Sequence, residues 1–104
     1  MKDLDICRLN DVYGGMLTER AREVVTQYYD CDYSLAEIAE NLSVTRQAVH
    51  IALKNAVAAL QNYEKKLKFA EKAGKISAEA RRGASESASD GQRAAFDRIL
   101  RILD

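Results

Sequence analysis

Apolar residues between Ser34 and Ala56 recur with a helical period, in two runs that a short break separates. The first run has the i, i+3, i+4, i+7 spacing of one buried helix face, and its members are Leu35, Ile38, Ala39 and Leu42. The break falls at Ser43 and Val44. The inward positions of the second run are Val49, Leu53 and Ala56. The pattern predicts two helices joined by a tight turn.

The polar residues beside these runs agree with the same two helices. Ser34 followed by Glu37 forms a capping-box pattern, and Thr45 is suited to cap the second helix. The small residue Ala39 and the β-branched Val49 are typical packing residues of a helix-turn-helix. In that motif the second helix enters the major groove of DNA. An ordinary helical hairpin is the alternative interpretation.

The rest of the chain has helical patterns and no run of alternating β-branched residues. Thr18 is a candidate N-cap before an apolar stripe that includes Val24 and Val25. We therefore expect an all-α fold: a small helical domain with a helix-turn-helix, a long following helix and a C-terminal amphipathic helix.

The second helix of the motif has no stop signal at its expected end. Apolar residues continue at alternating spacings of four and three, as in a heptad repeat, through Val49, Leu53, Ala56, Leu60, Tyr63, Leu67 and Ala70. This seam fits packing within the chain or against a second subunit, which would make a homodimer. The helix is expected to end at Gly74 or at Gly83.

The last thirty residues differ in character from those before them. The stretch from Gly83 to Gly91 is small, polar and linker-like, and Phe96 begins an amphipathic stripe that ends at Leu103. That last helix needs a groove in its own core, in a partner subunit or in another protein. We expect a helix-turn-helix domain over residues 1–74 and a helical extension over residues 75–104.

The charge of the chain sums to zero, but its distribution is uneven. Residues 63–83 carry seven basic and three acidic side chains, just beyond the expected recognition helix. A stripe of four lysines, separate from the apolar seam, comprises Lys65, Lys68, Lys72 and Lys75. It is either a solvated face or a face that follows the phosphates of DNA or RNA.

Sequence signals for catalysis are weak. The one histidine, His50, lies inside the second helix without a nucleophile at a recognisable spacing, and no glycine-rich phosphate loop is present. Cys7 and Cys31 lack metal-ligand spacing, and no apolar run resembles a signal peptide or a membrane span. We expect a cytoplasmic protein with free thiols that is not an enzyme and holds neither a metal nor a cofactor.

If the motif binds DNA, the exposed start of the second helix makes the contacts. Arg46 and Gln47 suit base edges or the backbone, because both side chains are long and carry several donors. Thr45 and Lys54 are placed for phosphates. His50 and Ile51 would line the groove side, where Ile51 suits a thymine methyl group.

Several pieces of the chain, in order, resemble the YlxM-type helix-turn-helix proteins of Gram-positive bacteria: LTER, QYYDCDYSLAEIAENL, SVTRQAVH and NYEKKL. The resemblance covers about residues 9–72. It implies a sigma region 4-like helix-turn-helix in a small non-enzymatic protein, encoded beside genes of the signal recognition particle. It also implies a DNA-binding regulator or, alternatively, an accessory protein that binds the particle's GTPase or RNA.

Two departures limit what the resemblance carries. Ser43 stands where glycine or asparagine would most easily adopt the left-handed backbone of the turn, at a cost of about 1 kcal/mol. The stretch after Gly74 has no counterpart in the quoted pieces.

Overall fold

The chain forms helices over nearly its whole length, which confirms the expected all-α fold. The computed structural model describes residues 4–103, and within that range it has α-helices and short helical turns but no strand. The elements are α1 (Leu4–Tyr13), η1 (Gly14–Met16), α2 (Glu19–Val25), η2 (Thr26–Asp30), α3 (Leu35–Leu42), α4 (Arg46–Leu67), α5 (Phe69–Glu86) and α6 (Asp90–Leu103). They divide into two compact units between Lys68 and Phe69, here called the N-terminal unit and the C-terminal hairpin.

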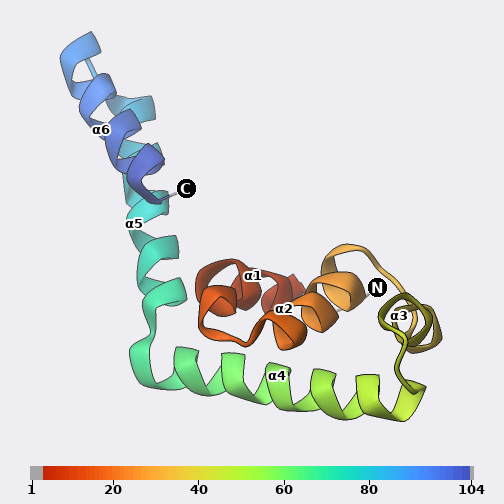
Figure 1. Ribbon diagram of the computed structural model, residues 1–104. Helices are drawn as coiled ribbons and strands as arrows, with labels where there is room; N and C mark the ends of the chain where they lie inside the picture. Colours follow the sequence, from red (N-terminus) through yellow and green to blue (C-terminus); the bar gives the residue numbers. More distant parts are fainter. Residues whose placement is uncertain (1–3, 104) are drawn as a thin grey trace. The chain divides into compact units, whose positions relative to one another are not determined.

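Helix α4 is the common support of the N-terminal unit. Helices α1, α2 and α3 all pack against it, and Figure 1 shows them along one side of its length. The largest fully buried side chains come from α2, α3 and α4, and they are Val24, Val25, Ile38, Val49 and Leu60. Each such side chain stabilises the fold by about 1.5–3 kcal/mol relative to an exposed position. The first part of the apolar seam, from Val49 to Leu60, is thus buried inside this unit.

Side-chain caps begin α2 and α3 at the predicted residues. The Thr18 hydroxyl accepts from the Ala21 N–H at 3.2 Å. Ser34 and Glu37 form a complete capping box, with both hydrogen bonds at 3.1 Å. The caps fix where α2 and α3 start, because each satisfies a backbone donor that the helix leaves unpaired.

The predicted single long helix is wrong beyond Leu67. Lys68 adopts a left-handed conformation, with φ of 51°, and its N–H donates to the Glu64 carbonyl at 2.8 Å. This closes α4 without a glycine, so the sequence gives no stop signal there. Leu67 is 52% exposed, and Ala70 is buried in α5 instead of extending the seam.

The C-terminal hairpin consists of α5 packed on α6. Neither Gly74 nor Gly83 ends a helix, because both lie inside α5, which continues to Glu86. The predicted linker therefore shrinks to residues 87–89, and Ser89 caps α6 by accepting from the Gln92 N–H at 3.2 Å. In the described residues, no helix is long and apolar enough to cross a membrane.

Gly83 has a packing role that its linker-like sequence hides. A Cβ atom added to it would lie 2.5 Å from the ring of Phe96. Real side chains do not approach that closely, so only glycine lets the Phe96 ring lie directly on the α5 backbone. The amphipathic α6 therefore finds its groove on α5 of the same chain.

Candidate nucleic-acid interface

The turn between α3 and α4 sets how the two helices of the motif meet. Ser43 has φ of 57°, in the left-handed region that its position predicts. Its N–H donates to the Glu40 carbonyl at 3.3 Å, and the Val44 N–H donates to the Ala39 carbonyl at 3.0 Å. This pair of hydrogen bonds is a Schellman closure, which ends α3 sharply and turns the chain into α4.

Helix α3 holds α4 by its buried face. Ile38 is fully buried and Ala39 is 7% exposed, so the small alanine lets the two helices approach closely. On the other side, the Asn41 amide donates to the Gln27 side-chain oxygen at 3.1 Å. Together these contacts fix the orientation of the first turns of α4 relative to the rest of the N-terminal unit.

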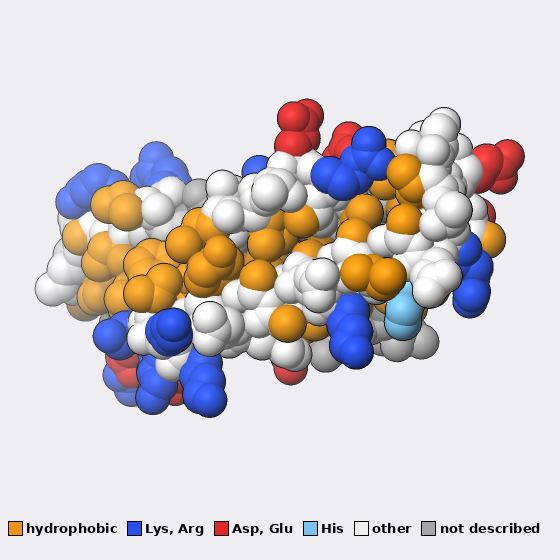
Figure 2. All heavy atoms as spheres, turned by 60° about the horizontal axis from the view of Figure 1, so that its bottom comes forward, with side chains coloured by type: hydrophobic (Ala, Val, Ile, Leu, Met, Phe, Trp, Pro, Cys, Tyr) orange, Lys and Arg blue, Asp and Glu red, His pale blue; other side chains and the backbone are white. Residues whose placement is uncertain are grey.

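All six side chains predicted to contact DNA are exposed, and they are Thr45, Arg46, Gln47, His50, Ile51 and Lys54. Gln47, Ile51 and Lys54 lie on the side of α4 opposite Val49 and Leu53, which are buried, whereas Thr45 and Arg46 lie at the exposed N-terminal end of the helix. Ile51 is 51% exposed, so its side chain is accessible to a ligand. Figure 2 views the molecule from the side of α4, where hydrophobic and basic side chains share the surface.

Thr45 caps α4 and can still donate a hydrogen bond to a ligand. Its hydroxyl oxygen accepts from the Ala48 N–H at 3.0 Å, so it is the predicted N-cap. The hydroxyl hydrogen is still available to donate to a phosphate oxygen. The positive end of the α4 dipole lies at the same place and favours an anion.

The charge around the start of α4 favours binding of an anion, although the N-terminal unit as a whole is almost neutral. Between Glu40 and Glu64 the chain has no acidic residue, while Arg46 and Lys54 lie on the exposed side of α4. Over residues 1–68 the chain carries nine basic and ten acidic side chains. An anion is therefore attracted by a local patch and not by the net charge of the unit.

The predicted lysine face is not one stripe on one helix. All four lysines are exposed, but Lys65 lies near the end of α4 and Lys68 in the link, whereas Lys72 and Lys75 lie on α5 in the other unit. The break at Lys68 ends the helical periodicity that joined them. Lys75 also pairs with Glu71, at 3.2 Å.

Comparison with known protein families matches residues 1–88 to the family described as "UPF0122: Putative helix-turn-helix protein, YlxM / p13 like". The chain belongs to this family. The match includes the whole N-terminal unit and α5, and it stops before α6.

Curated UPF0122 proteins resemble the chain over a shorter range. A UPF0122 protein of Desulforamulus reducens is 58% identical over 59 residues, which are 57% of this chain and 50% of that protein. One of Symbiobacterium thermophilum is 51% identical over 70 residues, which are 66% of this chain and 65% of that protein. The chain thus aligns with only half to two thirds of the length of these UPF0122 relatives.

A shallow hollow beside the exposed α4 face adds a residue that sequence reasoning missed. It has a volume of about 370 Å³, and among its lining residues are Tyr29, His50 and Lys54. Tyr29 comes from η2 and stands edge-on to Tyr28, with 5.0 Å between the ring centroids. An aromatic ring beside two cationic or polar side chains can contact a sugar or a base. The adjacent Tyr28 and Tyr29, just before the motif, were the feature of the sequence that could have indicated this residue.

The remaining candidate chemistry is sparse. In the part of the chain that the structure describes, no group of three His, Cys, Asp or Glu side chains is arranged to hold a metal ion. Cys7 and Cys31 are free thiols. The Cys7 Sγ donates to the Tyr29 carbonyl at 3.5 Å, and burial together with the nearby Asp30 carboxylate raises the pKa of this thiol.

Proposed function

We propose that this protein is a DNA-binding regulatory protein that inserts the first turns of α4 into the major groove. The main support is the joint exposure of every predicted contact residue at the start of a helix that Val49 and Leu53 anchor in the core. Membership of a helix-turn-helix family supports the same ligand class.

Each side chain has a defined role in this proposal. Arg46 and Gln47 contact base edges, and each good bidentate contact contributes about 1–3 kcal/mol of discrimination. Thr45 donates to a phosphate at the helix start, and Lys54 reaches a phosphate further along. Ile51 contacts a thymine methyl group.

The near-neutral charge of the unit limits the affinity of one subunit. Few phosphate contacts give little counterion release, so non-specific binding is weak and its salt dependence shallow. Two subunits on two half-sites would raise the affinity without new kinds of contact. We therefore expect sequence-selective binding by a dimer.

The test is selection of duplexes from a random library, followed by fluorescence anisotropy on the selected sequence. Arg46→Ala plus Gln47→Ala should weaken binding by about 2 kcal/mol or more, roughly thirtyfold. Gln92→Ala plus Arg93→Ala removes the same two side-chain types from exposed positions on α6 and should leave affinity unchanged. Equal affinities for all three proteins would refute the proposal.

A second candidate is an accessory role in the signal recognition particle pathway, through the particle's RNA or its GTPase. Three exposed lysines near the end of α4, away from the proposed DNA face, favour it: Lys65, Lys66 and Lys68. Titration against the purified RNA and the purified GTPase separates the two ligands. Lys65→Glu plus Lys68→Glu should abolish the contact while the Arg46 and Gln47 double variant retains it; the opposite result would exclude this role.

A further inference from the structure

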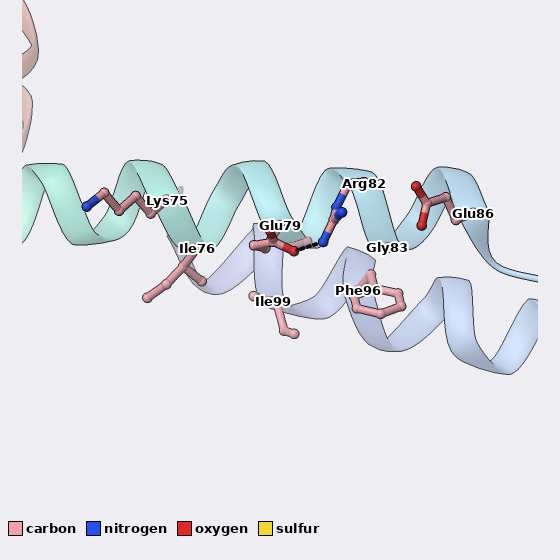
Figure 3. Close-up of a pocket in the computed structure, with 9 residues that line it drawn as sticks. Lys75, Ile76, Glu79, Arg82, Gly83, Glu86, Phe96 and Ile99 are labelled. Carbon is pink, nitrogen blue, oxygen red and sulfur yellow. Dashed lines mark hydrogen bonds and ion pairs between the residues drawn. The ribbon is translucent and has the colours of Figure 1, made fainter.

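An apolar groove runs along the α5–α6 hairpin, and its volume is about 470 Å³. Its floor is formed by Ile76, Ala80 and Gly83 of α5 with Phe96 and Ile99 of α6. Figure 3 shows Ile76, Phe96 and Ile99 on the same side of the two helices. The groove lies within one compact unit, so it is defined by the hairpin alone.

The hairpin does not bury its own large apolar side chains. Its buried apolar residues in the described range are the alanines Ala70 and Ala80. Ile76 is 49% exposed, Ile99 38% and Ile102 82%. The unit comprises only residues 69–104, and a unit below about 40 residues usually needs a disulfide, a metal or a partner to be stable. The hairpin should therefore be stabilised by a second surface that covers the floor of the groove.

The α5 rim of this groove carries charges of alternating sign: Lys75, Glu79, Arg82 and Glu86. The spacings of four, three and four residues keep all four on one side of the helix, as Figure 3 shows. The outer two and the inner two have the same midpoint, between Ala80 and Arg81. If a second, antiparallel row of the same four residues is placed against the first with the midpoints aligned, every positive charge lies opposite a negative one.

We propose that a second copy of this chain covers the groove, with the two α5 helices antiparallel about a two-fold axis near Ala80. Lys75 then faces the partner's Glu86, and Glu79 faces the partner's Arg82. One rotation brings both pairs into register because they share a midpoint, which is the condition for an isologous interface. The floors of the two grooves meet at the axis and form a four-helix arrangement.

Pairs within the chain do not compete strongly with this arrangement. Lys75 pairs with Glu71 at 3.2 Å, and Arg82 pairs with Glu79 at 2.5 Å, but all four side chains are at least half exposed. Exposed ion pairs stabilise little and exchange partners readily. Near the axis, Glu79 and Arg82 of both copies form a cluster with two charges of each sign. This role separates Lys75 from the lysine stripe for which the sequence suggested contact with phosphates.

Charge reversal at Lys75 and Glu86, the two ends of the row, tests the interface in the full-length chain without DNA. Sedimentation velocity over a wide concentration range gives the dimer dissociation constant. Lys75→Glu alone sets two acids against each other, and Glu86→Lys alone sets two bases, so each should weaken the dimer about tenfold. The double variant restores opposite charges and should return the constant to within about threefold of the wild type.

Lys72→Glu is the matched control, because it makes the same charge change on α5 but does not line the groove. Far-UV circular dichroism checks that each variant keeps its helices. A dimer that the single reversals weaken and the double variant restores supports the proposal. A monomer at every concentration, single reversals no stronger than Lys72→Glu, or a double variant without recovery would each overturn it. None of these outcomes depends on whether α4 binds DNA.

Discussion

The two compact units use different ways of holding helices together. The N-terminal unit packs branched and large side chains around α4, and five of them are fully buried. The C-terminal hairpin brings α5 and α6 together through small residues, with Gly83 under the Phe96 ring, and α6 has no buried residue. One unit closes its own core; the other leaves apolar surface for a partner.

This difference matters for function because each kind of packing suits a different task. A closed core holds α4 still, which preorganises a contact surface before it meets its ligand. A thin helical pair with exposed isoleucines gains stability when a second surface covers it. The five tyrosines all lie between residues 13 and 63, so tyrosine fluorescence reports the N-terminal unit separately from the hairpin.

The largest effect should come from opening a hole in the closed core. Ile38→Ala removes a fully buried side chain between α3 and α4, and the free energy of unfolding should fall by about 2–5 kcal/mol. Urea titration followed by tyrosine fluorescence measures it. Ile51→Ala, at an exposed position on α4, should change this free energy by no more than about 0.5 kcal/mol. Similar losses in both variants would mean that α3 does not anchor α4.

A methyl group at Gly83 should damage the hairpin alone. Gly83→Ala drives a Cβ to 2.5 Å from the Phe96 ring, and overpacking of this kind costs about 1–3 kcal/mol. Thermal unfolding followed by far-UV circular dichroism should show an earlier loss of helix, while the tyrosine transition stays in place.

Gly91 provides the control for that substitution, because an added Cβ there meets no atom within 4 Å. Gly91→Ala should be neutral or stabilise the hairpin by about 0.4–1 kcal/mol, since it reduces the freedom of the unfolded chain. Equal melting of the Gly83→Ala and Gly91→Ala proteins would contradict the close approach of α6 to α5.

Relief of backbone strain in the turn should stabilise the N-terminal unit slightly. Ser43 has φ of 57°, so Ser43→Gly should raise the unfolding free energy by about 1 kcal/mol. The tyrosine-detected urea midpoint measures it. Ser43→Ala keeps the strain and should bring no gain, and a gain from alanine equal to that from glycine would exclude this explanation.

The smallest effect is a difference in thiol reactivity within the N-terminal unit. Burial, helped by Asp30, raises the pKa of Cys7, which lowers its thiolate fraction at neutral pH, whereas Cys31 is exposed. Alkylation by iodoacetamide, followed by mass spectrometry, should therefore modify Cys31 first. The lag of Cys7 should shrink as pH rises and vanish in urea. Faster modification of Cys7 in the native protein would contradict its placement.

Much of the motif was predictable because its signals are local. A cap acts within three residues and a helix face repeats every three or four, so Ser34, Thr45 and Val49 could be assigned from the chain alone. The end of α4 was not predictable in this way. Lys68 takes a conformation that glycine would signal, whereas the two glycines that suggested helix ends lie inside α5.

The sequence by itself determined the all-α fold, the caps of α2, α3 and α4, the left-handed turn at Ser43 and the exposed residues at the start of α4, because each depends on neighbours along the chain. Only the tertiary structure decided that the apolar seam is buried in the N-terminal unit from Val49 to Leu60 and that the lysine stripe is divided between two units. It also decided that the ring of Phe96, thirteen residues further along the chain, packs against Gly83. These depend on which helix meets which surface, and no local period encodes that choice.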